Sequence, residues 1–588
     1  MKLILKEYLA NMGERGGLDT LLDNLLSQMG LNVLTTPMRG TKQHGVDIAA
    51  VGTLENDRNE TVYLFSIKSG DINRNNWDVG PQALRPSIGE IVDGYINGSI
   101  LPQYANFPIV IYVCCGGEVQ ENMVNVVSGF LKQTQQRDAT GRLQLRVMNG
   151  DQIANYLIKH LMSPRLVAID ERRLLFRCLS MAEDPDSSFL YFSRLLKLLL
   201  KDEKSGKRRI VRVRQLMVCL GLLKHHCVEI KNLDACYRAA EISLLHCWAY
   251  LDLKKCTAKR RMQLELTVFN RLWWQYVEIG QLYSEKVSSV CNDAYFMTYA
   301  CHAGNEVDVN LRLYDVMGRL ASYGASVWWY ALSFQNCPDL LRVCKEEVSK
   351  VGNALIGLLK NNPVASSPIR DDYAIEIGIV SLFLNQINWI DELHEWYMQV
   401  LNRTYKNFGL GGAYPSTGLD YLGLVEHLEH AHDDEYRSKV LPSSELFPMM
   451  YMFASVLGYK DVCSRISQIV EKYLKGCDFQ VWYPEPFSEE VFYTNGGNHG
   501  LQLVSQDLLD GDRFMRNVFS ECDKRKLPFS CLNVFGGLLL IGCRVHRCPL
   551  PPQLIQMIAK SHGNDETHTP DSDANKSASG GADCAAQI

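Results

Sequence analysis

The spacing of apolar residues changes character near residue 165. Before that point, short apolar runs of strand length alternate with helical periods. Strands are expected at Leu31–Thr35, Val46–Val51, Thr61–Lys68, Phe107–Cys115 and Leu143–Met148, and helices at Gly17–Met29, Pro86–Ile96, Val119–Lys132 and Asp151–Leu161. This αβββαβαβα order predicts an α/β domain, with a mixed central sheet flanked by helices.

From about residue 166 the strand-like runs nearly vanish, and long helical patterns follow one another. We therefore expect three parts: an α/β domain over 1–165, a large all-α region over 166–558, and a tail over 559–588. A break rich in small and polar residues, such as Gly409–Gly418, could divide the helical region into two subdomains. The tail is rich in Asp, Ser, Ala and Gly and has no aromatic residue, which predicts disorder.

Composition indicates an ordinary globular protein rather than a basic or membrane-bound one. Of the 588 residues, 46% are hydrophobic and 22% are charged, and the net charge of −5 still permits local DNA contacts. Lys6 and Glu7 break the short apolar run at the start of the sequence, so we expect no signal peptide; no apolar run of membrane-spanning length occurs, and the 19 cysteines form no CxxC pair. We expect a soluble, cytoplasmic protein with reduced thiols.

Candidate chemistry gathers at the ends of two predicted strands. Asp47 opens the second strand, and Lys68 closes the third. A carboxylate can hold Mg²⁺, which polarises a phosphate and lowers the pKa of bound water. A lysine can position or activate that water and offset charge that develops on the phosphate. Ser66 lies two residues before Lys68 and so shares its face of the strand.

These residues resemble the PD-(D/E)XK nuclease superfamily, and its Mrr-like restriction endonucleases in particular. The family pattern has an acid in the first helix, a G-x-D strand, and a strand ending in Glu-x-Lys or Gln-x-Lys. Residues 13–160 match it with Asp19 or Glu14, then Gly45-Val46-Asp47, then Ser66-Ile67-Lys68. The resemblance implies a restriction-endonuclease-like fold, Asp47 as the main metal ligand, Lys68 as the catalytic lysine, and Mg²⁺ as cofactor, with Mn²⁺ able to substitute.

The helix acid and Ser66 leave alternatives open. Asp19 lies eleven residues before Gly30, as the family spacing requires, whereas Glu14 stands in a context that suits a helix start. Ser66 replaces the usual Glu or Gln. Three accounts follow: the carbonyl of Ile67 with water fills the gap, Glu90 supplies a migrated carboxylate, or catalysis has been lost and DNA binding kept.

Other basic and aromatic residues are candidates for DNA contacts. Arg74, Trp77 and Arg85 lie in or beside the polar segment after Lys68, where they could touch phosphates or stack on a base; a solvated loop with one aromatic anchor is the other interpretation. The run Lys201–Arg214 carries Lys207, Arg208, Arg209 and Arg212, which either clamp a DNA backbone or form a solvated helix start. A metal role is expected neither for the histidines around His427, where the following acidic run suggests a solvated helix end, nor for those around His225, where core packing is expected.

The sequence favours a metal-dependent DNA endonuclease whose helical region recognises a target or holds a partner. By analogy, that layout resembles bacterial antiviral defence effectors. The chain has no P-loop, so any ATP-driven translocation would need a partner protein, and a homo-oligomer stays open. The alternative is an inactive nuclease fold that binds DNA or acts as a scaffold, with its function in the helical region.

Overall fold

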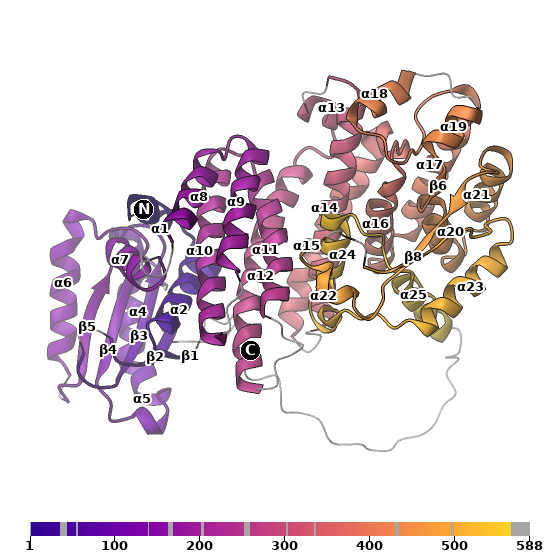
Figure 1. Cartoon of the computed structure of the whole chain (residues 1–588). Helices are drawn as coiled ribbons and strands as arrows, with labels where there is room; N and C mark the ends of the chain where they lie inside the picture. Colours follow the sequence, from indigo (N-terminus) through magenta and orange to yellow (C-terminus); the bar gives the residue numbers. More distant parts are fainter. Residues whose placement is uncertain are drawn as a thin grey trace, which may run out of the picture. The chain divides into compact units, whose positions relative to one another are not determined.

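A five-stranded mixed sheet forms the centre of the N-terminal part of the chain (Figure 1). The computed structural model describes residues 2–35, 44–54, 57–80, 82–138, 140–162, 168–201, 205–251, 259–301, 304–333, 337–429, 434–495, 497 and 499–565. The strands are β1 (Asn32–Thr35), β2 (Ile48–Gly52), β3 (Thr61–Lys68), β4 (Ile109–Cys115) and β5 (Leu143–Met148), which lie in that order. β1, β2 and β3 pair antiparallel, and β3, β4 and β5 pair parallel.

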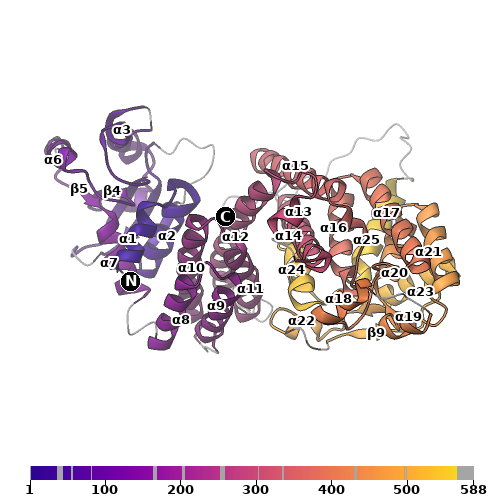
Figure 2. The same ribbon diagram turned by 90° about the horizontal axis from the view of Figure 1, so that it is seen from above.

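Helices cover both faces of this sheet, as Figure 2 shows from above. α1 (Lys2–Ala10), α2 (Asp19–Gln28) and α7 (Gly150–His160) pack together on one side. α3 (Arg74–Asp78), α4 (Leu84–Glu90) and α6 (Glu121–Gln136) lie on the other, where their apolar side chains join Val62, Leu64 and Ile111 in one buried cluster. The predicted mixed sheet with flanking helices is therefore present.

Two π-helical turns interrupt the expected helices. Residues Glu14–Leu18 form a π turn directly before α2, and Ile91–Tyr95 form another that links α4 to the short α5 (Ile96–Gly98). π turns widen the helix locally and often occur at functional sites. The first of them carries Glu14.

Most of the rest of the described chain is helical. Its helices are α8 (Ile169–Ser180), α9 (Pro185–Leu199), α10 (Gly206–Glu229), α11 (Asp234–Leu251), α12 (Lys259–Ser288), α13 (Phe296–Ala300), α14 (Glu306–Leu332), α15 (Pro338–Asn361), α16 (Ala374–Gln386), α17 (Ile390–Leu410), α18 (Tyr421–Glu429), α19 (Asp434–Val440), α20 (Leu446–Val456), α21 (Lys460–Tyr473), α22 (Ser488–Phe492), α23 (Gly511–Lys524), α24 (Gly537–His546) and α25 (Pro552–Asp565). Short 3₁₀ turns occur at Pro102–Tyr104, Pro363–Ser366, Asp371–Tyr373 and Ser530–Asn533. Two small ribbons pair β6 (Ser443–Ser444) with β7 (Asp478–Phe479) and β8 (Val481–Tyr483) with β9 (Leu501–Leu503). None of the described helices combines the length and apolar character that a bilayer span requires.

The chain divides into two compact units. Unit 1 comprises Met1–Ser243 and Thr257–Gln275, and unit 2 comprises Leu244–Cys256 and Tyr276–Ile588. The sheet thus shares its unit with α8, α9 and α10, which follow residue 165. At the other end, α25 continues to Asp565, so part of the segment predicted to be disordered is helical; residues 566–588 lie outside the described residues.

Candidate active site at the edge of the sheet

Asp47 is fixed at the start of β2 by a close approach of two backbones. Gly45 has φ +76°, and a Cβ there would lie 2.3 Å from the carbonyl oxygen of Ser87 on α4, so only glycine fits. Two residues later, the Asp47 N–H donates to the carbonyl of Phe65 at 2.8 Å. The Ile67 N–H donates to Asp47 Oδ2 at 2.7 Å. The Asp47 carboxylate is therefore held beside the end of β3.

Lys68 is the last residue of β3 and forms an ion pair with Glu14 of the π turn before α2. Its Nζ donates to both oxygens of Glu14, at 3.0 Å and 2.9 Å. The two residues are 54 positions apart in sequence, and their side chains are only 15% and 25% exposed. The π turn before α2 thus brings an acidic residue onto the lysine.

Two consecutive glycines support this end of β3. Gly116, which follows β4, donates its N–H to the Lys68 carbonyl at 3.3 Å. A Cβ on Gly117 would lie 2.1 Å from Asp71 Oδ1, the same oxygen that accepts the Glu118 N–H at 2.8 Å. The sequence interpretation did not include this loop, although paired glycines directly after a buried strand mark such a close approach.

The electrostatics of Asp47 show that several acids share this region. Burial of the side chain raises the pKa of Asp47 to about 6. The nearby Glu14 and Asp19 carboxylates add to the rise, whereas the Ile67 N–H and the Lys68 ammonium oppose it. The structure therefore brings four of the predicted site residues, namely Asp47, Lys68, Glu14 and Asp19, within electrostatic reach of one another.

Asp19 and Ser66 are both buried beside this group. Asp19 begins α2 at 7% exposure, and its Oδ1 accepts the Thr20 N–H at 2.5 Å and the Thr20 hydroxyl at 3.2 Å. Ser66 is 2% exposed and lies opposite Val113 of β4. Glu90 is exposed at the end of α4, and among the described residues no contact joins it to Asp47 or Lys68.

The donor set can be tested against a divalent cation. Within the described ranges, no three His, Cys, Asp or Glu side chains form a ready-made metal site. Asp47, Asp19 and Glu14 nonetheless supply the hard oxygen donors that Mg²⁺ prefers, and their mutual repulsion is what such a cation would relieve. Glu14 is bound by Lys68, so a cation would compete with that ion pair.

Trp77 does not lie on the surface, which corrects the idea that it stacks on a base. Its side chain is 0% exposed, and its ring packs edge-on against Phe130 with centroids 5.6 Å apart. Arg85 lies over the same Phe130 ring and pairs with Asp78 at 3.2 Å, while Arg74 is exposed at the start of α3. Trp77 is thus an aromatic anchor of this segment, while the phosphate contacts expected of Arg74 and Arg85 stay predictions.

From Gly206 on, the basic run forms the start of α10, and part of it turns inward; residues 202–204 lie outside the described residues. Arg212 pairs with Glu171 at 3.3 Å. Arg214 is buried and donates to Gln28 at 3.1 Å, and burial lowers its pKa to about 10. Arg208 is exposed and Arg209 half-buried, and the side chain of Lys207 lies outside the described residues. The run is therefore not a continuous basic surface.

The histidine clusters have structural partners. His427 is 0% exposed, and its two ring nitrogens lie 2.9 Å from the Tyr414 carbonyl and 3.2 Å from the Tyr436 hydroxyl. His430 and His432 lie outside the described residues. His225 pairs with Glu229 at 3.4 Å. A core role for His427 follows from these contacts.

Comparisons of this chain with protein-family models, curated proteins and solved structures give no match.

Proposed function

We propose that unit 1 is a divalent-metal-dependent endonuclease that hydrolyses phosphodiester bonds in DNA, with Asp47 and Lys68 at its centre. The proposal rests on one observation: four charged residues from separate elements meet at the end of the central strand β3. They are Lys68, Glu14, Asp47 and Asp19. Buried titratable groups with a raised pKa and charged neighbours cluster at functional sites. Such a group is typical of sites that handle phosphate and metal together.

The residues divide the chemistry as follows. Asp47, with Asp19 or Glu14, would hold Mg²⁺, which supplies charge neutralisation of the phosphate and a more acidic bound water. Lys68, once free of Glu14, donates to a phosphate oxygen or orients the attacking water. The Ile67 N–H keeps the Asp47 carboxylate oriented, and Ser66 offers a hydroxyl where the family that this domain resembles has a carboxylate or an amide.

A second candidate function has its own support. Lys68 is already paired with Glu14, Ser66 is buried, and the described residues hold no preformed metal cluster. These features favour a nuclease fold that binds DNA without cutting it. Unit 2 would then carry the function as a sensor or scaffold. In the active enzyme we propose a similar role for unit 2, namely recognition of a trigger in antiviral defence.

Cleavage of supercoiled plasmid by the full chain tests the proposal. Wild-type protein in Mg²⁺ or Mn²⁺ is expected to nick the plasmid, and EDTA should stop it. Asp47→Asn and Lys68→Met should each lower the rate by at least about a hundredfold, because each removes a group that acts in the transition state. Asp93→Asn and Lys132→Met are matched controls, since both residues are exposed in the same unit and should cut normally. Wild-type protein that never nicks DNA, yet binds it, would support the second candidate.

A further inference from the structure

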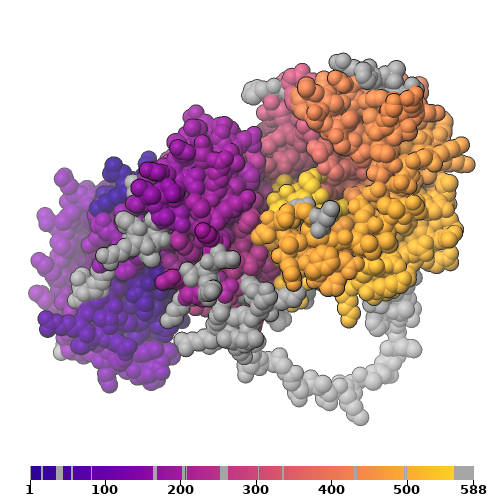
Figure 3. Space-filling model, in the orientation of Figure 1, coloured from indigo at the N-terminus to yellow at the C-terminus, as the bar shows by residue number. Residues whose placement is uncertain are grey.

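The α8–α9 hairpin of unit 1 presents a basic outer face. Its exposed basic side chains are Arg173 and Arg177 on α8, Arg194 and Lys197 on α9, and Lys201 just beyond α9. Arg194 and Lys197 are three residues apart and so share one side of α9. We call these five residues the hairpin face; Figure 3 shows the purple surface of this part of the chain.

Two arginines of the hairpin face converge on one aromatic ring. Arg177 lies 5.7 Å and Arg194 lies 5.9 Å from the centroid of Tyr191. One comes from α8 and the other from α9, so the ring holds two like charges close together across the hairpin. In the part of the chain that the structure describes, no carboxylate pairs with Arg177, Arg194 or Lys197.

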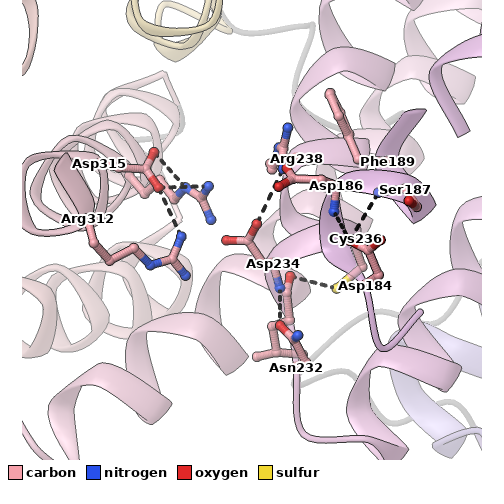
Figure 4. A network of polar contacts seen from close by, with 12 residues as sticks. Asp184, Asp186, Ser187, Phe189, Asn232, Asp234, Cys236, Arg238, Arg312 and Asp315 are labelled. Atoms are coloured by element: carbon pink, nitrogen blue, oxygen red, sulfur yellow. Dashed lines mark hydrogen bonds and ion pairs between the residues drawn. The ribbon is translucent and has the colours of Figure 1, made fainter. Parts of the chain in front are cut away.

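Several acidic residues of the hairpin lie at its closed end, where α8 turns into α9. Asp184 caps α9 by accepting the N–H groups of Asp186 and Ser187. Asp186 pairs with Arg238 at 2.6 Å, and that arginine also lies over the Phe189 ring (Figure 4). At the open end Asp170 meets Arg173 at 3.5 Å, but both side chains are about 70% exposed, so this pair contributes little. Most exposed acidic side chains of the hairpin therefore lie at its closed end.

We propose that the hairpin face binds the sugar-phosphate backbone of double-stranded DNA and holds it for the Asp47–Lys68 site. This inference rests on the proposed nuclease function of the same unit. Arg194 and Lys197 lie about 4.5 Å apart along α9, and Lys201 follows just beyond its end, which suits the close spacing of phosphates along duplex DNA. Guanidinium groups match phosphate oxygens in pairs, and Arg177 and Arg194 are already positioned by Tyr191.

Packing within unit 1 links the hairpin to the site. α8 and α9 both contact α10, and α10 contacts α1 and α2. α2 begins at Asp19 and follows the π turn that carries Glu14. Phosphates bound on the hairpin face are thus anchored to the scaffold that carries the acids of the candidate active site.

The test measures DNA binding without cleavage. A short fluorescein-labelled duplex is titrated with the full chain in EDTA, and anisotropy gives Kd at several salt concentrations. Arg177→Glu with Arg194→Glu should weaken binding at least about tenfold and lower the slope of log K against log salt by about two, because each lost phosphate contact removes about 0.9. Lys197→Glu with Lys201→Glu, which leaves Tyr191 untouched, should act similarly.

The control pair is Lys132→Glu with Arg137→Glu on and just after α6, where the charge change is the same and both residues are exposed. Equal Kd values for the hairpin and control pairs would overturn the proposal. So would tighter, hairpin-dependent binding to vesicles of anionic lipid than to DNA, since the exposed Phe176, Leu190 and Leu198 would suit a membrane surface. Hairpin-dependent DNA binding without any cleavage in Mg²⁺ would support the hairpin face and count against the nuclease alone.

Discussion

The raised pKa of Asp47 makes the site costly to fold, and this cost can be measured. Burial raises the pKa of Asp47 from the 3.8 of an ordinary aspartate to about 6. This rise corresponds to at most about 3 kcal/mol of destabilisation when the carboxylate is ionised. Asp47→Asn removes the charge but keeps an oxygen that accepts the Ile67 N–H. The variant should therefore be more stable than the wild type at neutral pH without metal.

The raised pKa also predicts how the contribution of Asp47 to the free energy of unfolding changes with pH. Because the folded pKa lies above the unfolded one, the favourable contribution of protonated Asp47 is complete below pH 3.8 and is lost as the pH rises through 6. The advantage of Asp47→Asn should consequently be about 1.5 kcal/mol near pH 5 and approach 3 kcal/mol at pH 8, before allowance for solvent that reaches the side chain. Urea unfolding of the full chain at both pH values, followed by a probe on unit 1, measures the difference.

Asp57 provides a matched control of opposite sign. Its pKa is lowered by hydrogen bonds from Arg146 and Tyr63, although burial alone would raise it. Asp57→Asn should therefore destabilise the protein at pH 8, and this loss should shrink as the pH falls below the ordinary aspartate value. If Asp47→Asn destabilises the chain at pH 8 as Asp57→Asn does, burial and the neighbouring acids do not raise the pKa of Asp47.

Three further predictions concern the scaffold. Gly45→Ala should lower the free energy of unfolding by at least about 2 kcal/mol, because Gly45 has a positive φ and a Cβ there would clash with the backbone of Ser87. Gly129→Ala, at an open position of α6, should be neutral or stabilising, and chemical denaturation compares the two variants. Arg271→Met should cost about 3–5 kcal/mol because it leaves the buried Asp23 uncompensated, against about 0–1 kcal/mol for Arg342→Gln in an exposed pair. Trp77→Ala should cost about 3–5 kcal/mol and Trp77→Phe clearly less, since phenylalanine keeps a ring against Phe130; thermal unfolding separates the two, and equal small losses would contradict the burial of Trp77.

Much of the sheet could be predicted because its strands carry their own signals. Thr61–Lys68 and Leu143–Met148 have the predicted bounds. The first is a mostly apolar run and the second alternates apolar and polar residues, and polar turns flank both. The approach of Asp47 to Lys68 follows from two neighbouring strands in register. These features depend on nearby sequence, which a pattern can reveal.

The features that escaped prediction depend on distant contacts or weak local signals. The pairing of Glu14 with Lys68 joins a helix start to a strand end, and apolar spacing does not distinguish a π turn from an α-helix. The side chain of Asn73 caps the start of the five-residue α3, and Trp77 packs against Phe130 of the distant α6. Similarly, a run of arginines in sequence could not reveal that Arg212 and Arg214 face Glu171 and Gln28.

The central claim is that the acids around Asp47 take a divalent cation. Electron paramagnetic resonance of free Mn²⁺, titrated with the full chain at pH 8, measures this directly. We predict one Mn²⁺ bound per chain, weaker binding below pH 6 where Asp47 is protonated, and loss of the site in Asp47→Asn but not in Asp93→Asn. Mn²⁺ binding that is absent, or that is unchanged in Asp47→Asn, would contradict the account.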